Sequence, residues 1–129
     1  MLDCYKMGLK EVTILKSFKE EFADFLINTY QAIGIGNSTL SSGPNSSPLL
    51  GSATVYKTAN RGIETLNSTV RVRWESDLIR GDLFSDVVRE IAVVKNATNG
   101  RYEGFLRLLV DDFPIQEQDT LRISVEVEI

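Results

Sequence analysis

Apolar and β-branched residues dominate two runs of this chain, residues 87–94 and 102–110, on either side of a short polar stretch. The polar stretch contains Asn99 followed by Gly100, and both residue types tolerate the positive φ angles that tight turns require. The pattern from Val87 to Val110 therefore predicts a β-hairpin, which we place at the centre of an antiparallel domain.

Two further segments alternate between apolar and polar residues. In residues 69–76, Val70, Val72 and Trp74 share one face of the predicted strand. The last segment, Leu121–Ile129, has an aliphatic residue at every second position. A period of two is typical of a half-buried antiparallel strand, so both segments are predicted to lie in a sheet. Weaker strand patterns cover Tyr30–Ile35 and Ser52–Thr58.

The clearest helical pattern covers Ser17–Asn28. Ser17 followed three residues later by Glu20 is the pattern of a capping box, in which each side chain bonds an early backbone N–H group. The apolar residues form one stripe at helical spacing, namely Phe18, Phe22, Phe25 and Leu26. We expect this stripe to pack on a sheet, because a domain of this size needs the area for its core. A partner-binding helix is the less favoured alternative.

Residues 37–51 are rich in Ser, Gly, Pro and Asn, and two prolines prevent this segment from continuing a strand or helix. Its three leucines, Leu40, Leu49 and Leu50, could anchor it, which disfavours a disordered linker. The segment is predicted to be a long ordered loop or arm. We expect the three leucines to contact a neighbouring subunit, because exposed leucines on a free arm would promote aggregation.

Together these elements predict a single β-rich domain over residues 1–129, with residues 1–11 as a short strand or a flexible lead. One helix precedes about six strands, and the connections in the second half are short. The fold class is therefore mainly β, an antiparallel β-sandwich or jelly-roll-like arrangement with one N-terminal amphipathic helix packed on the sheet.

The composition of the chain disfavours several classes of binding partner and of chemical site. The net charge is −4, which disfavours nucleic acid as a partner because a basic surface is its usual footprint. No apolar run approaches the length that spans a bilayer, and the first residues do not resemble a signal peptide. Cys4 is the only cysteine, so an internal disulfide is excluded, and the chain has no histidine, the commonest metal ligand. The carboxylates lack the spacing of an EF-hand loop, and Gly34-Ile35-Gly36 lacks the third glycine of a dinucleotide-binding motif, so we expect no metal or cofactor site.

Short motifs in the chain have simple structural interpretations. Arg80–Asp82 reads Arg-Gly-Asp, a known receptor-binding tripeptide that most often marks just a turn. Four glycosylation sequons are interpreted mainly as turn residues, and they would matter only if the protein is displayed outside an archaeal or eukaryotic cell. These sequons begin at Asn37, Asn45, Asn67 and Asn96.

One combination of segments is more specific. Residues 32–39, Ala-Ile-Gly-Ile-Gly-Asn-Ser-Thr, lead through the Ser/Pro-rich loop to 47–52, Ser-Pro-Leu-Leu-Gly-Ser, and a basic segment ends at Arg61. Residues 89–94, Arg-Glu-Ile-Ala-Val-Val, and 105–108, Phe-Leu-Arg-Leu, follow. This series is similar to a family of virion proteins of tailed bacteriophages and related archaeal viruses. The resemblance implies a tail-fibre, baseplate or capsid-surface component that is commonly oligomeric and has no enzymatic activity.

Glu90 is an unusual residue in an otherwise apolar predicted strand. An unpaired charge would be costly there, so Glu90 is predicted to meet a basic partner. Arg61, Arg71 and Arg107 are the candidates. The alternative is that Glu90 lies on a solvated face of the strand.

The sequence therefore leads to two functional hypotheses. The first is a non-enzymatic virion structural protein, made in the host cytoplasm, whose partners are copies of itself and other virion proteins. The second is a receptor- or carbohydrate-binding module of a virus particle that uses residues 37–51, Tyr56 and Trp74 to bind a glycan or a host receptor. A hydrolase is disfavoured, because only carboxylates are available and no pair can be placed by spacing.

Overall fold

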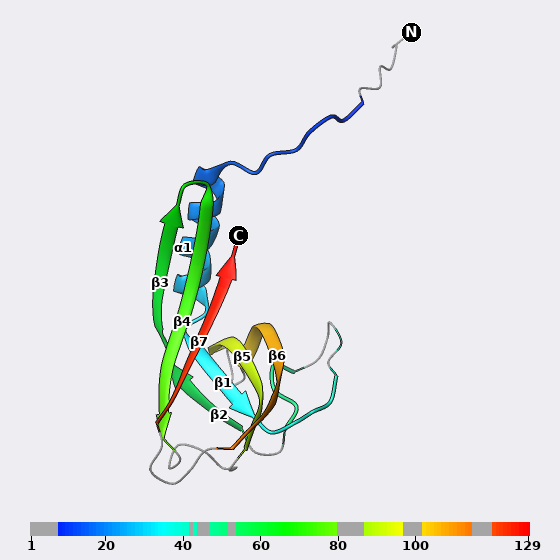
Figure 1. Cartoon of the computed structure of the whole chain (residues 1–129), viewed down its shortest axis with the longest axis vertical. Coiled ribbons are helices and arrows are strands. Elements are labelled where there is room, and N and C mark those ends of the chain that lie inside the picture. The colour runs from blue at the N-terminus through cyan, green and yellow to red at the C-terminus, as the bar shows by residue number, and fades with distance from the viewer. Residues whose placement is uncertain are drawn as a thin grey trace.

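The structure of the chain is a computed structural model that describes residues 8–41, 43, 47–51, 54–79, 87–96, 102–114 and 120–129. Within these residues, one helix is followed by seven strands (Figure 1). In chain order they are α1 (Lys16–Thr29), β1 (Ala32–Gly36), β2 (Thr54–Thr58), β3 (Asn60–Leu66), β4 (Thr69–Ile79), β5 (Val87–Asn96), β6 (Tyr102–Pro114) and β7 (Thr120–Glu128). The Arg80–Asp82 motif, the Asn99-Gly100 turn and Asn45 lie outside the described residues.

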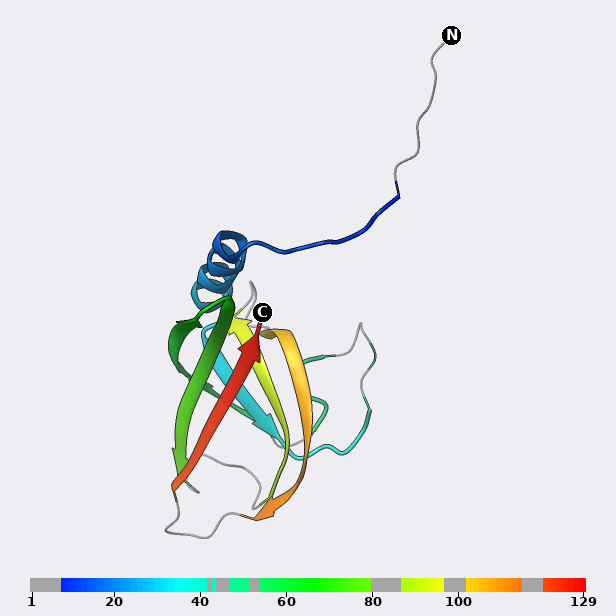
Figure 2. The same ribbon diagram turned by 45° about the horizontal axis from the view of Figure 1, so that its top comes forward.

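The strands form two antiparallel sheets. One has four strands in the order β2-β1-β5-β6, and the other has three in the order β3-β4-β7. Buried side chains from both sheets share one core, so the arrangement is sandwich-like, as Figures 1 and 2 show from two directions. The predicted fold class, mainly antiparallel β with one helix near the sheet, is confirmed.

The predicted hairpin is confirmed by the pairing of β5 with β6, which runs from Val87 opposite Pro114 to Asn96 opposite Tyr102. Its predicted place at the centre of the domain is wrong, because the hairpin ends the four-stranded sheet. The prediction that residues 111–114 break the second strand is wrong, because β6 continues through Pro114. β6 is an edge strand, and an edge position tolerates a proline that cannot donate to a neighbouring strand.

β3 was not predicted. Only Ile63 of its seven residues is half-buried and the other six are exposed, so the sequence carries no alternating pattern there. The strand exists because its whole length pairs with β4, from Asn60 opposite Glu75 to Leu66 opposite Thr69. Asn67 occupies the intervening turn with a φ of 55°, which asparagine tolerates better than most residues. The interpretation of this sequon as a turn residue is therefore confirmed.

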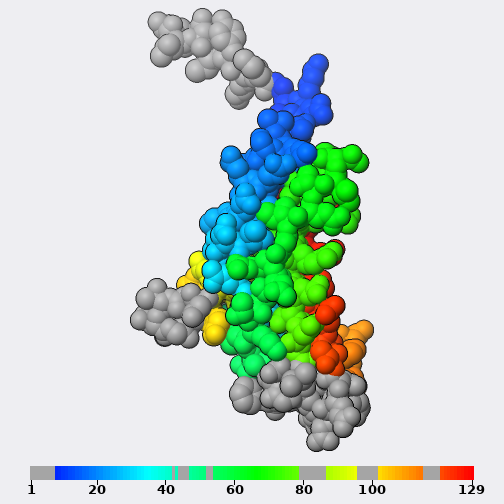
Figure 3. Space-filling model, turned by 90° about the vertical axis from the view of Figure 1, so that its left-hand side faces the viewer, coloured from blue at the N-terminus to red at the C-terminus, as the bar shows by residue number. Residues whose placement is uncertain are grey.

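Two predictions about α1 are wrong. The helix begins at Lys16 after Leu15, and no side chain caps it, because Ser17 already lies inside the first turn. The helix packs on β4 and β3 through Ala23 and Leu26. The packing predicted for the apolar stripe is therefore confirmed for Leu26 and wrong for its phenylalanines. Phe18 and Phe25 are 57% and 55% exposed. Ala23 is buried in the core that α1 shares with β4. Figure 3 shows α1, in blue, lying against β3, in green.

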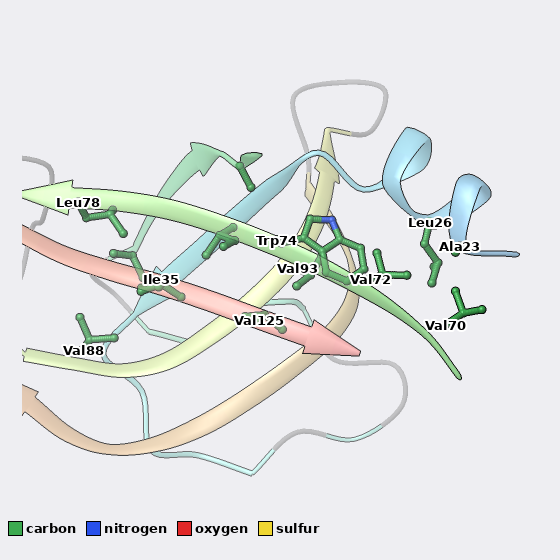
Figure 4. Close-up of a cluster of buried hydrophobic side chains, with 13 residues drawn as sticks. Ala23, Leu26, Ile35, Val70, Val72, Trp74, Leu78, Val88, Val93 and Val125 are labelled. Carbon is green, nitrogen blue, oxygen red and sulfur yellow. The ribbon is translucent and has the colours of Figure 1, made fainter. Parts of the chain in front are cut away.

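The core lies between the two sheets and continues under α1. Figure 4 shows Ala23 and Leu26 at the end of the core that holds Val70 and Val72. At the centre, the Trp74 indole N–H donates to the Tyr30 carbonyl oxygen over 2.8 Å. The alternation predicted for β4 and β7 is confirmed, since the inward residues of both strands belong to this core, namely Val70, Val72, Trp74, Leu78, Leu121, Ile123, Val125 and Val127.

Removal of β7 and Ile129 is predicted to abolish folding. Ile123 and Val125 are buried, and each aliphatic side chain contributes roughly 1.5–3 kcal/mol when fully buried. Two of them therefore account for a large part of the typical 5–15 kcal/mol stability of a domain, before the lost hydrogen bonds to β4 are counted. Thermal unfolding followed by circular dichroism checks this. Removal of residues 1–14, whose described part is exposed, should leave a cooperative transition, and the same result for the β7 deletion would contradict the assignment.

Candidate functional site

The outer face of the four-stranded sheet carries the candidate site, because the loop 37–51 covers it. β1 reads Ala-Ile-Gly-Ile-Gly, and its two isoleucines, Ile33 and Ile35, belong to the core between the sheets. Successive side-chain positions of a strand point to opposite faces, so Ala32, Gly34 and Gly36 lie on the outer face. The side of β1 that faces the loop therefore consists only of small residues.

Glu90 lies on this outer face, in β5. It is opposite Gly36 of β1. Ala92, two residues further along β5, packs with Leu49 and Val94 in a small cluster that is separate from the main core. Val88 is two residues before Glu90 but belongs to the main core. An irregularity in the pairing with β6, between Val88 and Glu90, accounts for this change of face.

The Glu90 carboxylate is fully buried and holds both ends of the loop. At the start of the loop, the Ser38 backbone N–H donates to Glu90 Oε1 over 3.3 Å. At the end of the loop, the Gly51 N–H donates to Oε1 over 2.8 Å and the Leu50 N–H to Oε2 over 3.1 Å. One side chain therefore fixes segments of the loop that are twelve or more residues apart.

Arg107 of β6 is the basic partner of Glu90. Its Nε and Nη2 atoms donate to Glu90 Oε2 over 2.9 and 2.7 Å, and its Nη1 donates to the Leu40 carbonyl oxygen over 2.9 Å. The Arg107 side chain is only 6% exposed. The prediction of a basic partner is confirmed, and the alternative of a solvated Glu90 is wrong, because the loop shields the outer face.

The other two candidate partners have different roles. Arg61 donates from Nη1 to the Ile27 carbonyl oxygen and so joins β3 to α1. Arg71 is exposed on β4, in the other sheet. Arg107 is favoured by the strand register, because it lies opposite Ala92, diagonally adjacent to Glu90, at a distance that long side chains reach.

The charge state of Glu90 follows from two opposing effects. Burial by itself raises the pKa of a carboxyl group, because it disfavours the charged form. The Leu50 N–H, the Arg107 guanidinium and the N–H groups of Gly51 and Ser38 outweigh burial and hold the pKa of Glu90 below its ordinary value. Glu90 is therefore ionised at neutral pH.

The position of the Glu90 carboxylate also explains why residues 36 and 51 are glycines. A Cβ atom at Gly36 would lie 2.2 Å from Glu90 Oε1, and a Cβ atom at Gly51 would lie 2.8 Å from the same oxygen and 2.3 Å from Asn37 Oδ1. All three distances are shorter than a van der Waals contact allows. A side chain at either position would displace the carboxylate or the loop.

The predicted interface leucines separate into three environments. Leu49 is buried within its own chain, in a cluster with Ala92 and Val94. Leu50 is half-buried and contributes its N–H group to Glu90. Leu40 is 65% exposed on the outer part of the loop. Whether any of them contacts another subunit stays a prediction, and Leu40 has the free side chain for it.

Aromatic residues border the site without forming an open platform. The rings of Tyr56 and Tyr102 stack on each other with centroids 3.7 Å apart, beside the Leu49 cluster. Trp74 is fully buried in the main core, so it is not available to bind a glycan. The prediction that Trp74 joins Tyr56 in a binding surface is therefore wrong.

The arrangement is suited to fixing a loop rather than to chemistry. The Glu90 oxygens accept hydrogen bonds from three backbone N–H groups and from Arg107, so the carboxylate is poorly placed to accept a further proton or to bind a cation. Within the described ranges, no group of three or more Cys, Asp or Glu side chains is placed to hold a metal ion. No helix in the same ranges has the length and apolar character needed to cross a membrane.

Sequence reasoning identified Glu90 and offered Arg107, but it missed the residues that complete the site. Ser38 and Gly51 act through backbone N–H groups, which every residue except proline has, so their side chains give no signal. Gly36 could have been found from the alternation in β1, where small residues occupy every second position beside two buried isoleucines.

The Glu90→Gln variant is predicted to lose stability in a pH-dependent way. At pH 7 the loss should be roughly 3–5 kcal/mol, because Arg107 is left as an uncompensated buried charge. The pKa of Glu90 is lowered by folding, so its contribution is complete above the unfolded pKa of about 4.3 and is lost as the pH falls through the folded value. The difference between wild type and variant should therefore shrink below about pH 4.

Urea unfolding at a series of pH values measures this difference. Asp112→Asn is the matched control, because it neutralises a carboxylate that pairs with Arg89 at the surface and should cost no more than about 1 kcal/mol. Equal losses for the two variants at pH 7, or a Glu90→Gln loss that does not decrease at all as the pH falls below the ordinary range of a carboxyl group, would contradict the structural role of the ionised Glu90.

Comparison of the chain with known proteins does not assign it to a protein family. No protein-family model matches it, and no curated protein matches it. What the protein does has therefore to be argued from the Glu90 site, the loop that the site fixes and the exposed surfaces of the described residues.

Proposed function

We propose that the protein is a non-enzymatic structural subunit of a virus particle, in the tail or on the capsid surface, that assembles with copies of itself and other virion proteins. The observation that carries the proposal is the convergence of the segments that resemble virion proteins. β1, both ends of the loop 37–51, Glu90 and Arg107 come from distant parts of the sequence and meet at one site.

The physical role of this site supports a structural function. A buried ion pair and three backbone hydrogen bonds fix the two ends of the loop, while its outer residues Thr39, Leu40 and Ser41 are exposed. A loop that is ordered before it meets a partner loses less conformational entropy on binding. The same geometry is poor for catalysis, because the buried carboxylate is saturated with donors.

Leu40 is the residue through which the loop would contact a neighbouring subunit. Its backbone carbonyl is held by Arg107, and its N–H group donates to the Ser38 hydroxyl oxygen over 3.1 Å. These bonds hold the backbone while the side chain stays exposed. The position therefore combines a fixed backbone with an uncovered apolar side chain, as a contact residue requires.

The Leu40→Ser variant is predicted to leave the subunit folded and to weaken self-assembly. The matched control is Leu49→Ser, which empties a buried position and should destabilise the subunit by about 2–5 kcal/mol. Light scattering reports assembly and a thermal melt reports folding. If Leu40→Ser assembles as wild type does, the loop is not a subunit contact.

The virion assignment is tested on particles produced by the source of this sequence. Particles are purified on a density gradient, the chain is sought in them by mass spectrometry, and gold-labelled antibody locates it by electron microscopy. The expected result is a fixed number of copies per particle at the tail or the capsid surface. Absence of the chain from intact particles would refute the virion function.

A further inference from the structure

α1 has two apolar faces, and the subunit covers only one of them. The covered face is formed by Ala23, Leu26 and Ile27, which pack on the core with β4 and β3. The uncovered face carries three phenylalanine rings arranged in a row. The rings of Phe18 and Phe22 are stacked with centroids 6.3 Å apart, and Phe22 and Phe25 have the same separation.

The uncovered residues have the spacing of a helix–helix seam. Leu15, at the N-cap, and the three phenylalanines follow one another at intervals of three, four and three residues. This is the alternation of the a and d positions of a heptad repeat, whose side chains insert between those of a facing helix. The covered face lies beside the seam on the same helix and does not share its residues.

We propose that this seam, Leu15–Phe18–Phe22–Phe25, binds α1 of a second copy of the chain. A seam of this spacing matches the side chains of a facing helix, and α1 is the one helix among the described residues. A homomeric partner for the seam is therefore the same helix of another subunit. The inference rests on the proposed self-assembly and names a surface that carries it, separate from the loop 37–51.

The available apolar area agrees with an interface between copies. Three aromatic side chains of roughly 200 Å² each, about half exposed, offer on the order of 300 Å². The preceding residues Leu9, Val12, Ile14 and Leu15 are 57–81% exposed and raise the total to roughly 500–600 Å², taking about 60–120 Å² for an aliphatic side chain. A standard interface needs about 800 Å² from each partner, so this surface provides most of one.

The residues before the helix extend the same surface. Residues 8–15 form no helix or strand and run away from the body of the subunit in both Figure 1 and Figure 2. Their large apolar side chains stay more than half exposed. In an assembly, this lead can lie on the subunit whose helix packs against the seam, so the lead and α1 form one continuous contact surface.

The test compares the full-length wild type with two triple variants by light scattering and thermal melting. Phe18→Ser, Phe22→Ser and Phe25→Ser remove the seam. The matched control makes three substitutions on the polar side of the same helix, Glu20→Ser, Glu21→Ser and Asp24→Ser. The expected result is a multimeric wild type and control, and a seam variant whose molar mass falls at least twofold while its melting transition remains cooperative.

A cross-linking measurement keeps the test decisive if the seam variant does not fold. Phe22→Cys in a Cys4→Ser background should form a disulfide-linked dimer on mild oxidation, because facing seam positions bring Cα atoms within the range of a disulfide. Asp24→Cys in the same background is the control and should stay unlinked. Equal cross-linking of the two cysteines would overturn the inference.

The outcomes separate the two proposals. If the wild type assembles and the seam variant is folded with an unchanged mass, the seam is not the contact, while self-assembly stands. If the wild type is monomeric at every concentration, both the seam and the proposed self-assembly are overturned, although the chain could still be found in particles. If the seam variant melts without cooperativity and Phe22→Cys does not cross-link, the rings belong to the subunit's own packing.

Discussion

The burial of one carboxylate constrains the whole outer side of the four-stranded sheet. Glu90 has no exposure to solvent, so its charge has to be compensated by groups within the chain. Arg107 supplies the opposite charge, and the loop supplies N–H groups from Ser38, Leu50 and Gly51. The loop can bring those groups close only if Gly36 and Gly51 have no side chain. The geometry of the loop, the two glycines and the arginine are thus consequences of a single buried charge.

The short strand β1 serves two layers at once. Ile33 and Ile35 pack in the core between the sheets. On the outer face of β1, the missing side chains of Gly34 and Gly36 leave room for Tyr56 and for the loop. A Cβ atom at Gly34 would lie 2.8 Å from the Tyr56 ring and 3.0 Å from Leu49 Cδ1, so this close packing depends on a missing side chain. The loop therefore forms a partial third layer on the sandwich. Its ends are held by charge and hydrogen bonds, and Leu49 is held by apolar contact.

Two buried alanines lie where elements pack together, while several large apolar residues remain exposed. Ala23 belongs to the core that α1 shares with β4, and Ala92 packs with Leu49. Phe18, Phe25 and Leu40 are instead more than half exposed. The exposed side chains lie on two separate surfaces, the helix seam and the loop. Both surfaces are separate from the core, so contacts made through either one would leave the packing of the core unchanged.

The amino-acid sequence by itself determined the features that depend on local periodicity and on the cost of burying a charge. The alternation in β4 and β7 specified their inward faces, the two apolar runs specified the β5–β6 hairpin, and Glu90 in an apolar strand required a basic partner. Only the tertiary structure decided which arginine that is, because the choice depends on strand order and register, which join residues far apart in the chain. It also decided that β3 is a strand, through pairing alone, and that β5 turns Glu90 outward at an irregularity in its pairing with β6. The helix shows the limit most clearly. Its period indicated that the phenylalanines share a face, but tertiary packing decided which face meets the sheet, and it buries Ala23 and Leu26 instead of the rings.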